Sequence, residues 1–329
     1  MKKLTPDQLT HFEEEGYLLL KGLLDPQTDL QPVTQEYTDV LDRLAGELYE
    51  NGEIASTYDH LPFGKRLMKV YQDSGKVHAQ YFDCSLPQLG TREDSPIWVG
   101  PEVFHTLRNE KLLDIIEDLV GPEIYSNPVQ HIRIKPPEYV IQNGAIDSRT
   151  GFVAGFAVGA TPWHQDNGVV LPEADNTNML TVWFPLTEAT VENGCLQIIP
   201  RSHKNGVRHH CSSNIGLYVR DEHLELDNVL TCPMSPGDVL FLHRRTCHSS
   251  LPNKSDDVRV SLDLRYNPTG QSTGRDVFPG FVARSRAHPE TELHDPKAWA
   301  QLWYDARSRL AVHNIPSYNR WRTDDPACA

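Results

Sequence analysis

Two side chains that can bind a metal ion stand two positions apart in Trp163-His164-Gln165-Asp166. On a β-strand, side chains alternate between faces, so we expect His164 and Asp166 to point the same way. An imidazole and a carboxylate converging from one strand supply two corners of a 2-His-1-carboxylate face. Such a face holds iron(II) and leaves three positions open for oxygen and a cosubstrate. The triplet alone is weak evidence, because most His-X-Asp pairs are surface or hydrogen-bonded pairs.

A third ligand is expected from a later strand, and His248 is the best candidate. It follows the apolar stretch Val239–Leu242. Arg259 comes eleven residues after it, on the polar face of the next strand. A guanidinium can hold the distant carboxylate of a dicarboxylate cosubstrate in a bidentate pair, which a lysine matches less well. Each residue alone has a structural explanation, but together with His164 and Asp166 the set indicates a metal site with a carboxylate-binding arginine.

Short strands separated by turns dominate the chain around these residues. The clearest alternation runs from Val258 to Tyr266, where apolar and polar residues exchange at every position. The other strand-length stretches are Tyr17–Leu20, Val129–Lys135, Met179–Phe184, Gly194–Ile199 and Val239–Leu242. Many short strands with turns between them favour a sandwich or barrel.

Helical patterns lie at both ends of the chain. Thr5-Pro6-Asp7-Gln8 predicts a helix start with Thr5 as its N-cap, and Gly16 predicts its end. Apolar stripes at helical spacing cover residues 32–50, 107–120 and 299–310. Residues 51–106 show too little periodicity to place elements. The fold class we expect is therefore mainly β with flanking helices, in a single domain over 1–329 whose barrel core spans about 125–285.

A glycine-rich stretch from about Asn143 to Ala160 directly precedes the His164 segment. Its glycines suit a mobile cover that orders over a substrate. They also suit an irregular barrel strand with glycine kinks. The sequence leaves both readings open.

Composition narrows the range of partners. The 329 residues carry a formal charge of −14, which weighs against nucleic acid or an anionic membrane as the main partner. No apolar run is long enough for a membrane span, and no signal peptide is recognisable, so we expect a cytoplasmic protein. The six cysteines form no CxxC pair, and we expect free thiols.

At these motifs the chain resembles the phytanoyl-CoA dioxygenase-like oxygenases, which depend on iron(II) and 2-oxoglutarate. The resemblance covers most of the chain. It is carried by Thr5-Pro-Asp-Gln, Glu15-Gly-Tyr, Trp163-His-Gln-Asp, Asn193-Gly-Cys-Leu-Gln-Ile-Ile-Pro-Arg-Ser-His-Lys, Pro236-Gly-Asp-Val-Leu-Phe, and His248-Ser-Ser-Leu-Pro-Asn followed by Arg259. The ordered set is specific, although no single piece is.

The resemblance implies a double-stranded β-helix, or jelly-roll, fold. It implies that His164, Asp166 and His248 bind iron(II) and that Arg259 anchors 2-oxoglutarate, with O2 as the second cosubstrate. By position, Lys135, Trp183 and Ser250 are similar to further residues of the cosubstrate pocket. The chain departs from the family at Arg201, where glycine is usual, and over residues 139–160, which have no clear counterpart.

The function we expect is oxidation of a C–H bond in a small organic metabolite, with release of succinate and CO2. Hydroxylation is the default outcome, while desaturation, ring closure and endoperoxide formation stay open. Halogenation is disfavoured because Asp166 occupies the position that family halogenases leave to chloride.

Two rival functions are a jelly-roll protein that only binds a metal or small molecule, and a zinc hydrolase using the same triad. Neither rival accounts for Arg259. The substrate, the pathway and the oligomeric state are not readable from the sequence.

Overall fold

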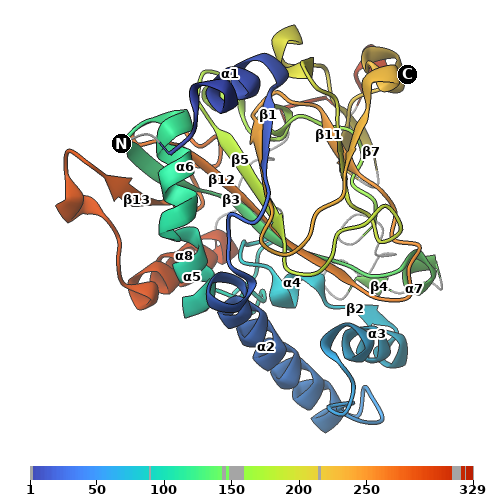
Figure 1. The fold of residues 1–329 in the computed structure, drawn as a ribbon. Coiled ribbons are helices and arrows are strands. Elements are labelled where there is room, and N and C mark those ends of the chain that lie inside the picture. Colours follow the sequence, from blue (N-terminus) through green and yellow to red (C-terminus); the bar gives the residue numbers. More distant parts are fainter. Residues whose placement is uncertain are drawn as a thin grey trace.

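The computed structural model describes residues 3–88, 90–142, 146–147, 159–213, 216–312, 320–322 and 324–328. These residues form two facing antiparallel sheets, with most of the helices gathered on one side (Figure 1). Two smaller strand pairs are also present, β2 (Lys76–Val77) with β4 (Ile146–Asp147) and β7 (Cys211–Ser213) with β8 (Gly216–Tyr218).

The larger sheet is entirely antiparallel, because each of its neighbouring pairs runs in opposite directions. Its strands in spatial order are β1 (Tyr17–Leu20), β10 (Val239–His243), β5 (Leu180–Pro185), β12 (Arg259–Pro268), β3 (Glu123–Lys135) and β13 (Phe281–Ser285). The smaller sheet has the order β11 (His248–Ser250), β6 (Leu196–Ile198) and β9 (Leu230–Cys232).

Strand alternation leaves the larger sheet buried on both faces. On β10, Leu240 and Leu242 pack with Leu196 and Ile198 of the smaller sheet. Their neighbours on β10 belong instead to the large core that the helices cover. A sheet that is buried on both faces in this way is the layered arrangement of a jelly-roll. The predicted fold class, mainly β with flanking helices around a jelly-roll core, is therefore confirmed.

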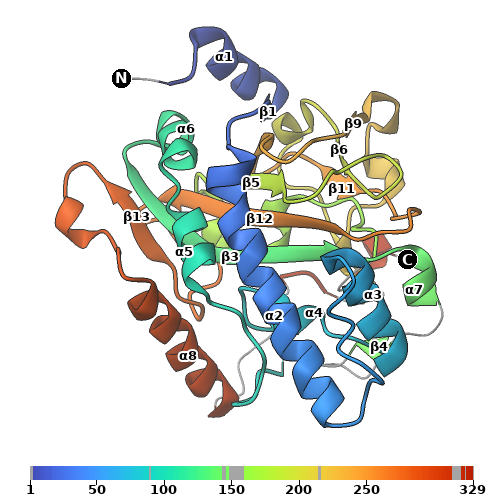
Figure 2. The ribbon, with the colours of Figure 1, turned by 60° about the horizontal axis from the view of Figure 1, so that its bottom comes forward.

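Helices α2, α3, α5 and α8 lie across the outer face of the larger sheet (Figure 2). The helices are α1 (Pro6–Glu15), α2 (Gln31–Glu50), α3 (Phe63–Ser74), α4 (Ala79–Phe82), α5 (Pro101–Leu107), α6 (Glu110–Val120), α7 (Glu138–Gln142) and α8 (Pro296–Val312). The predicted caps of α1 are confirmed, since Thr5 accepts from the Gln8 amide and Gly16 ends the helix at φ +79°. Among the described residues, no helix is both long enough and apolar enough to cross a membrane.

Two sequence-based boundaries in the N-terminal half differ from the structure. The helix expected over 107–120 is present as α6 over Glu110–Val120, but it begins three residues later, because Asn109 is its N-cap and Leu107 is the last residue of α5. Residues 51–106, where the sequence pattern did not allow elements to be placed, contain α3, α4, β2 and nearly all of α5. The glycine-rich stretch 143–160 lies mostly outside the described residues, so neither reading of it is tested.

Candidate metal and cosubstrate site

The backbone brings His164 and His248 side by side. His164 forms an isolated antiparallel bridge with His248, and each amide donates to the other's carbonyl at 3.0 Å. The expected strand through Asp166 is wrong, because a 3-10 turn, Asp166–Val169, begins directly after the bridge. The turn still places Asp166 beside both imidazoles, so the side chains converge by a different route from simple strand alternation.

Both imidazoles are held in the tautomer that a metal ligand needs. Nδ1 of His164 donates to the Pro162 carbonyl at 2.9 Å, and Nδ1 of His248 donates to the Thr246 carbonyl at 3.0 Å. A carbonyl can only accept, so each Nδ1 carries the proton and each Nε2 keeps its lone pair. Both Nε2 atoms lie 3.9 Å from an oxygen of Asp166, too far for a hydrogen bond.

The three side chains form a compact, buried donor set. Their ligand atoms all lie within 4.8 Å of one another, and Asp166 is only 1% exposed. Burial, together with the neighbouring His248, lowers the pKa of His164 to about 3, so this imidazole is neutral at physiological pH. A neutral imidazole and an ionised carboxylate are the states that bind a divalent cation. The donor set therefore fits iron(II).

Asp166 has two further partners that the sequence did not reveal. Nη2 of Arg265 donates to its Oδ1 at 2.5 Å, and the Thr181 hydroxyl donates to its Oδ2. Burial opposes ionisation of Asp166, but the Arg265 guanidinium holds the pKa of this carboxyl well below its usual range. Arg265 also contacts Asp263 at 3.1 Å. A carboxylate with such support is oriented before any metal arrives.

An irregularity in β3 accompanies the placement of Arg265. Between Asp263 and Arg265 the register of β12 against β3 shifts, so β3 has two more residues there than β12. Pro128, which cannot donate to a ladder, lies in this bulge, where proline is tolerated. The neighbouring Val129 carbonyl accepts from Nη1 of Arg265 at 3.3 Å. Pro128 inside an otherwise β-like stretch was the available signal for the bulge.

Arg259, at the other end of the same strand face, has neutral partners. Its guanidinium donates to the Ser261 hydroxyl at 2.5 Å and to the Gly194 carbonyl at 3.2 Å. It is 2% exposed, and among the described residues no carboxylate lies within ion-pair distance of it. Burial and nearby Arg133 lower the pKa of Arg259 to about 10, which leaves it charged at neutral pH. A buried cation without a counter-ion suits an anionic ligand.

The other three candidate cosubstrate residues lie around Arg259. Its guanidinium carbon is 5.5 Å from the centre of the Trp183 ring, within cation–π range. Nζ of Lys135 donates to the Ser250 hydroxyl and to the Leu251 carbonyl, each at 2.6 Å. Burial, with the Arg259 charge nearby, lowers the pKa of Lys135 to about 6. The structure thus gathers two buried basic groups, a hydroxyl and an aromatic face in one place.

Gly194 allows this close packing and explains part of the Asn-Gly-Cys motif. Its φ is +92°, and a Cβ there would lie 2.5 Å from the Leu251 carbonyl and 2.8 Å from the Lys135 side chain. Any larger residue would push Lys135 away from Ser250. We expect glycine to be required at this position.

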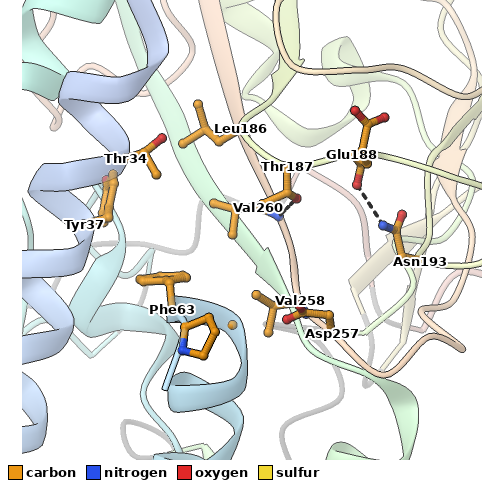
Figure 3. A pocket seen from close by; sticks show the side chains of 12 residues that line it. Thr34, Tyr37, Phe63, Leu186, Thr187, Glu188, Asn193, Asp257, Val258 and Val260 are labelled. Atoms are coloured by element: carbon orange, nitrogen blue, oxygen red, sulfur yellow. Dashed lines mark hydrogen bonds between the residues drawn. The ribbon is translucent and has the colours of Figure 1, made fainter. Parts of the chain in front are cut away.

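A separate cavity of about 380 Å³ lies on the helix side of the larger sheet (Figure 3). None of the seven candidate site residues lines it. Its walls come from α2, the start of α3 and the outward side of β12, including Tyr37, Phe63 and Val260. Val260 points away from its neighbour Arg259 because side chains alternate along the strand. This cavity therefore lies on the opposite face of the sheet from the candidate site.

The expectation of free thiols is wrong for two of the six cysteines. Cys211 and Cys328 form a disulfide, while the other four are free and buried. His209 lies beside the disulfide, and these three residues make a second group of metal-binding types. Since the two sulfurs are bonded to each other, this group offers no thiolate to a metal in the oxidised state.

Comparisons with known proteins agree with this fold. The sequence model of the family described as phytanoyl-CoA dioxygenase (PhyH) matches residues 12–261. A 1-deoxypentalenic acid 11-beta-hydroxylase from Streptomyces arenae is 38% identical over 153 residues, which cover 40% of this chain and 53% of that protein. The chain thus spans about half the length of this relative. Rice phytanoyl-CoA dioxygenase 1 is 25% identical, over 81% of this chain and 90% of its own length.

Among solved structures, a non-haem monooxygenase, ThoJ in its apo form, superposes with a TM-score of 0.59. The two chains share 17% identity over 92% of this chain and 95% of that one. At this level of identity the likeness concerns the fold alone, and it supports the jelly-roll architecture.

Proposed function

Because the chain belongs to the phytanoyl-CoA dioxygenase family of iron(II)- and 2-oxoglutarate-dependent oxygenases, we propose that it oxidises a C–H bond in a small organic molecule. Hydroxylation is the proposed outcome, and succinate and CO2 are the coproducts. The whole chain acts as one oxygenase domain. When bound, the iron and 2-oxoglutarate supply the oxidising power with O2, and the protein supplies binding, orientation and exclusion of water.

The proposal assigns one role to each end of the site. His164, Asp166 and His248 hold the iron through two Nε2 atoms and a carboxylate oxygen, and the Nδ1–H bonds fix the ring orientations. Arg259 binds the distant carboxylate of 2-oxoglutarate. Lys135, Ser250 and Trp183 lie around Arg259 and are proposed to contact the same dianion.

One observation supports the oxygenase over its rivals. Arg259 is charged, buried and without a carboxylate partner among the described residues. It pairs across the sheet with Lys135, whose amine contacts Ser250 on β11, the strand that begins with His248. A zinc hydrolase needs no such cation beside its metal-bound water, and a simple metal-binding protein needs none either. The substrate class is proposed from the small-molecule acid named in the Streptomyces relative, whose match covers only part of each chain.

Turnover assays with reconstituted protein test the proposal. Purified metal-free protein is supplied with iron(II), 2-oxoglutarate and air, and succinate is measured across a panel of small organic acids and their neutral analogues. We expect succinate release to require both iron(II) and 2-oxoglutarate and to rise with the right substrate. Stoichiometric zinc together with activity indifferent to 2-oxoglutarate would contradict the proposal and favour the hydrolase.

A further inference from the structure

The last described segment of the chain lies against the turn that carries Asp166. We call residues 320–322 and 324–328 the C-terminal strap. Arg320 forms an ion pair with Asp175 at 2.8 Å and donates to the Asn167 carbonyl at 3.4 Å. The Trp321 indole donates to the Gly168 carbonyl at 2.7 Å. The strap thus holds the two peptide carbonyls that directly follow the proposed metal ligand.

His210 connects the strap to the other side of Asp166. Its ring stacks on Trp321, with centroids 5.4 Å apart and planes 22° apart. Nδ1 of His210 donates to the Arg208 carbonyl, and Nε2 accepts from the Gln165 amide at 2.9 Å. The ring also covers Gly168, where a Cβ would lie 2.1 Å from it. The residues on both sides of Asp166 are therefore held in one stack with Trp321.

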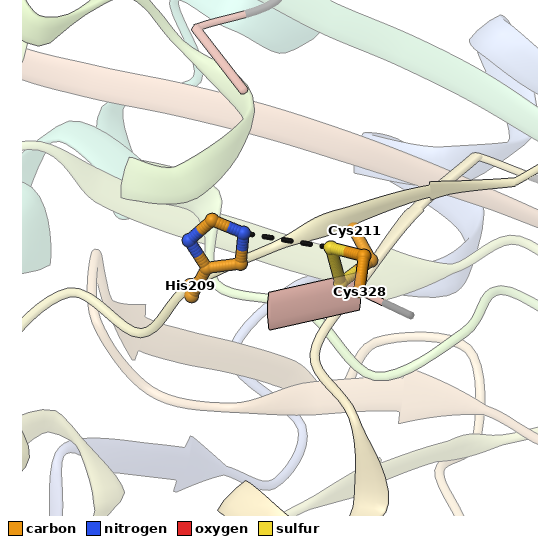
Figure 4. A group of neighbouring side chains, drawn as sticks. All are labelled: His209, Cys211 and Cys328. Atoms are coloured by element: carbon orange, nitrogen blue, oxygen red, sulfur yellow. Dashed lines mark hydrogen bonds between the residues drawn. A yellow bond between two sulfur atoms is a disulfide. The ribbon is translucent and has the colours of Figure 1, made fainter. Parts of the chain in front are cut away.

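A disulfide fixes the far end of the strap (Figure 4). It joins Cys328 to Cys211, which is buried next to β8, and the Ala327 carbonyl accepts from Arg220 at 3.0 Å. Cys328 is only partly buried. His209 Nε2 lies 3.5 Å from the Cys328 sulfur and 3.6 Å from a carboxylate oxygen of Asp325. Among the described residues this is the one covalent link of the strap to the barrel, and the less buried of its two cysteines belongs to the strap.

We propose that the Cys211–Cys328 pair is a reversible thiol–disulfide modification site that controls how firmly the strap holds the Asp166 turn. The strap lies outside residues 12–261, so the family match does not account for it. The effect on iron binding rests on the proposed function, whereas the effect on the turn does not. The partner is a dithiol reductant, either a small molecule or a protein.

The exchange is balanced in two steps. A thiolate of the reductant attacks the Cys328 sulfur, the disulfide breaks, and Cys211 leaves as a thiolate that takes up a proton. The second thiol of the reductant then attacks the reductant's sulfur in the mixed disulfide, and Cys328 is released as a thiol. The reductant becomes a disulfide, and the protein gains two electrons and two protons. His209, beside the Cys328 sulfur, is placed to transfer a proton to it.

Reduction leaves the strap held by Arg320, Trp321 and a few surface contacts. Local opening of a segment depends on how few interactions hold it, so the strap detaches more often once the covalent link is gone. The carbonyls of Asn167 and Gly168 then lose their partners, and His210 loses its stacked ring. Asp166 is held less firmly, and outer partners of this kind typically change metal affinity by about tenfold to hundredfold when they are lost.

Hydrogen exchange on the metal-free full-length protein tests the proposal directly. Oxidised protein and protein reduced with dithiothreitol are compared at the amides of residues 165–169, with alkylation and mass spectrometry reporting the state of Cys211 and Cys328. We expect exchange at these amides to be at least about tenfold faster after reduction. The C328S variant should exchange fast in both conditions, and W321A should exchange fast with its disulfide intact.

Iron(II) affinity is then measured on the same proteins after the reductant is removed without air. We expect the reduced wild type and C328S to bind iron about tenfold or more weakly than the oxidised wild type. Unchanged exchange at residues 165–169, or two alkylated thiols in the oxidised protein, overturns the proposal. Faster exchange with unchanged iron affinity overturns its link to the metal site. The exchange readout needs neither iron nor turnover, so failure of the proposed function would be seen separately.

Discussion

The two arginines of β12 lie six residues apart on one face of one strand, yet their surroundings are opposite. Arg265 contacts two carboxylates, Asp166 and Asp263. Arg259 contacts a hydroxyl and a carbonyl, with Lys135 nearby. Both are almost fully buried. A buried guanidinium that already has its counter-ion is part of the framework, whereas one without a counter-ion is prepared for an anionic ligand.

This contrast decides between the two residues as the 2-oxoglutarate anchor. On sequence alone Arg265 is the natural second choice, because it shares the face of Arg259. In the structure it is committed to Asp166, so a dicarboxylate would have to compete with a charge-assisted bond at 2.5 Å. We call the part of β12 around Arg265, next to Asp166, the metal end, and the part around Arg259 the anion end. Mutations at the two ends should therefore affect different ligands, iron(II) at the metal end and 2-oxoglutarate at the anion end.

Of the variants that test this contrast, Asp166→Ala should have the largest effect on turnover. We expect Asp166→Ala to reduce turnover to background even at saturating iron(II), because two neutral imidazoles remain as ligands. The readout is substrate-dependent succinate release, with added formate as a test of rescue. Substantial turnover without any added carboxylate would show that the triad is misassigned.

The same variant tests the role of Arg265. A lone buried carboxylate is costly, so if Asp166 had no counter-ion, its removal would leave the stability of the metal-free protein unchanged or raise it. The ion pair reverses that expectation, because the variant leaves Arg265 with Asp263 alone. We expect the free energy of unfolding of metal-free protein to fall by about 3 kcal/mol, the lower end for breaking a buried pair. Chemical denaturation measures it, and an unchanged midpoint would remove Arg265 from the framework.

At the anion end, Arg259→Lys should weaken 2-oxoglutarate binding by about tenfold to hundredfold. Loss of a bidentate charge-assisted pair costs about 1.5–3 kcal/mol, which corresponds to that range. Iron affinity should stay near the wild-type value. Anaerobic titration of the iron-loaded protein with 2-oxoglutarate gives the measurement.

Arg265→Lys is the matched control, with the same substitution on the same strand. It should weaken iron binding and leave 2-oxoglutarate affinity nearly unchanged, because its partner is the metal ligand Asp166. If the two variants exchange these phenotypes, the assignment of the two ends is reversed.

The pH dependence of 2-oxoglutarate binding should report on Lys135. Its pKa, lowered to about 6 by burial, means that this lysine is mostly neutral in free protein at pH 8. A bound dianion favours the ammonium, so binding takes up a proton. Affinity should therefore be greatest below pH 6 and fall above it, by up to about tenfold per pH unit. Lys135→Met should flatten the profile, whereas a steep profile in this variant would assign the proton elsewhere.

The elements of the fold were more predictable from the sequence than the surroundings of the site residues. Period-two alternation gave β12, and capping residues gave both ends of α1, because these signals are local. The charge state around Asp166 was not predictable, since Arg265 and Thr181 reach it from two other strands, 99 and 15 residues away along the chain. The Cys211–Cys328 bond joins residues 117 positions apart, and no spacing rule announces such a pair. Local patterns indicate helices and strands, whereas contacts between residues on different strands form only when the sheets have packed together.

The smallest expected effects come from two hydroxyl groups, one at each end. Thr181→Val removes the hydroxyl that donates to Asp166 and keeps the side-chain shape. Ser250→Ala removes the hydroxyl that accepts from Lys135. A single such hydrogen bond contributes about 0.5–1.5 kcal/mol, or roughly twofold to tenfold in affinity.

Which of the two affinities each variant lowers shows whether the two ends of the site act independently. Thr181→Val should weaken iron(II) binding and spare 2-oxoglutarate, and Ser250→Ala should do the opposite, with both affinities measured anaerobically on each variant. The double variant should show the sum of the two single effects, because groups without shared partners act independently. If instead each variant lowers both affinities by similar factors, the metal end and the anion end form one coupled network. The different surroundings of Arg259 and Arg265 would then describe two parts of a single site.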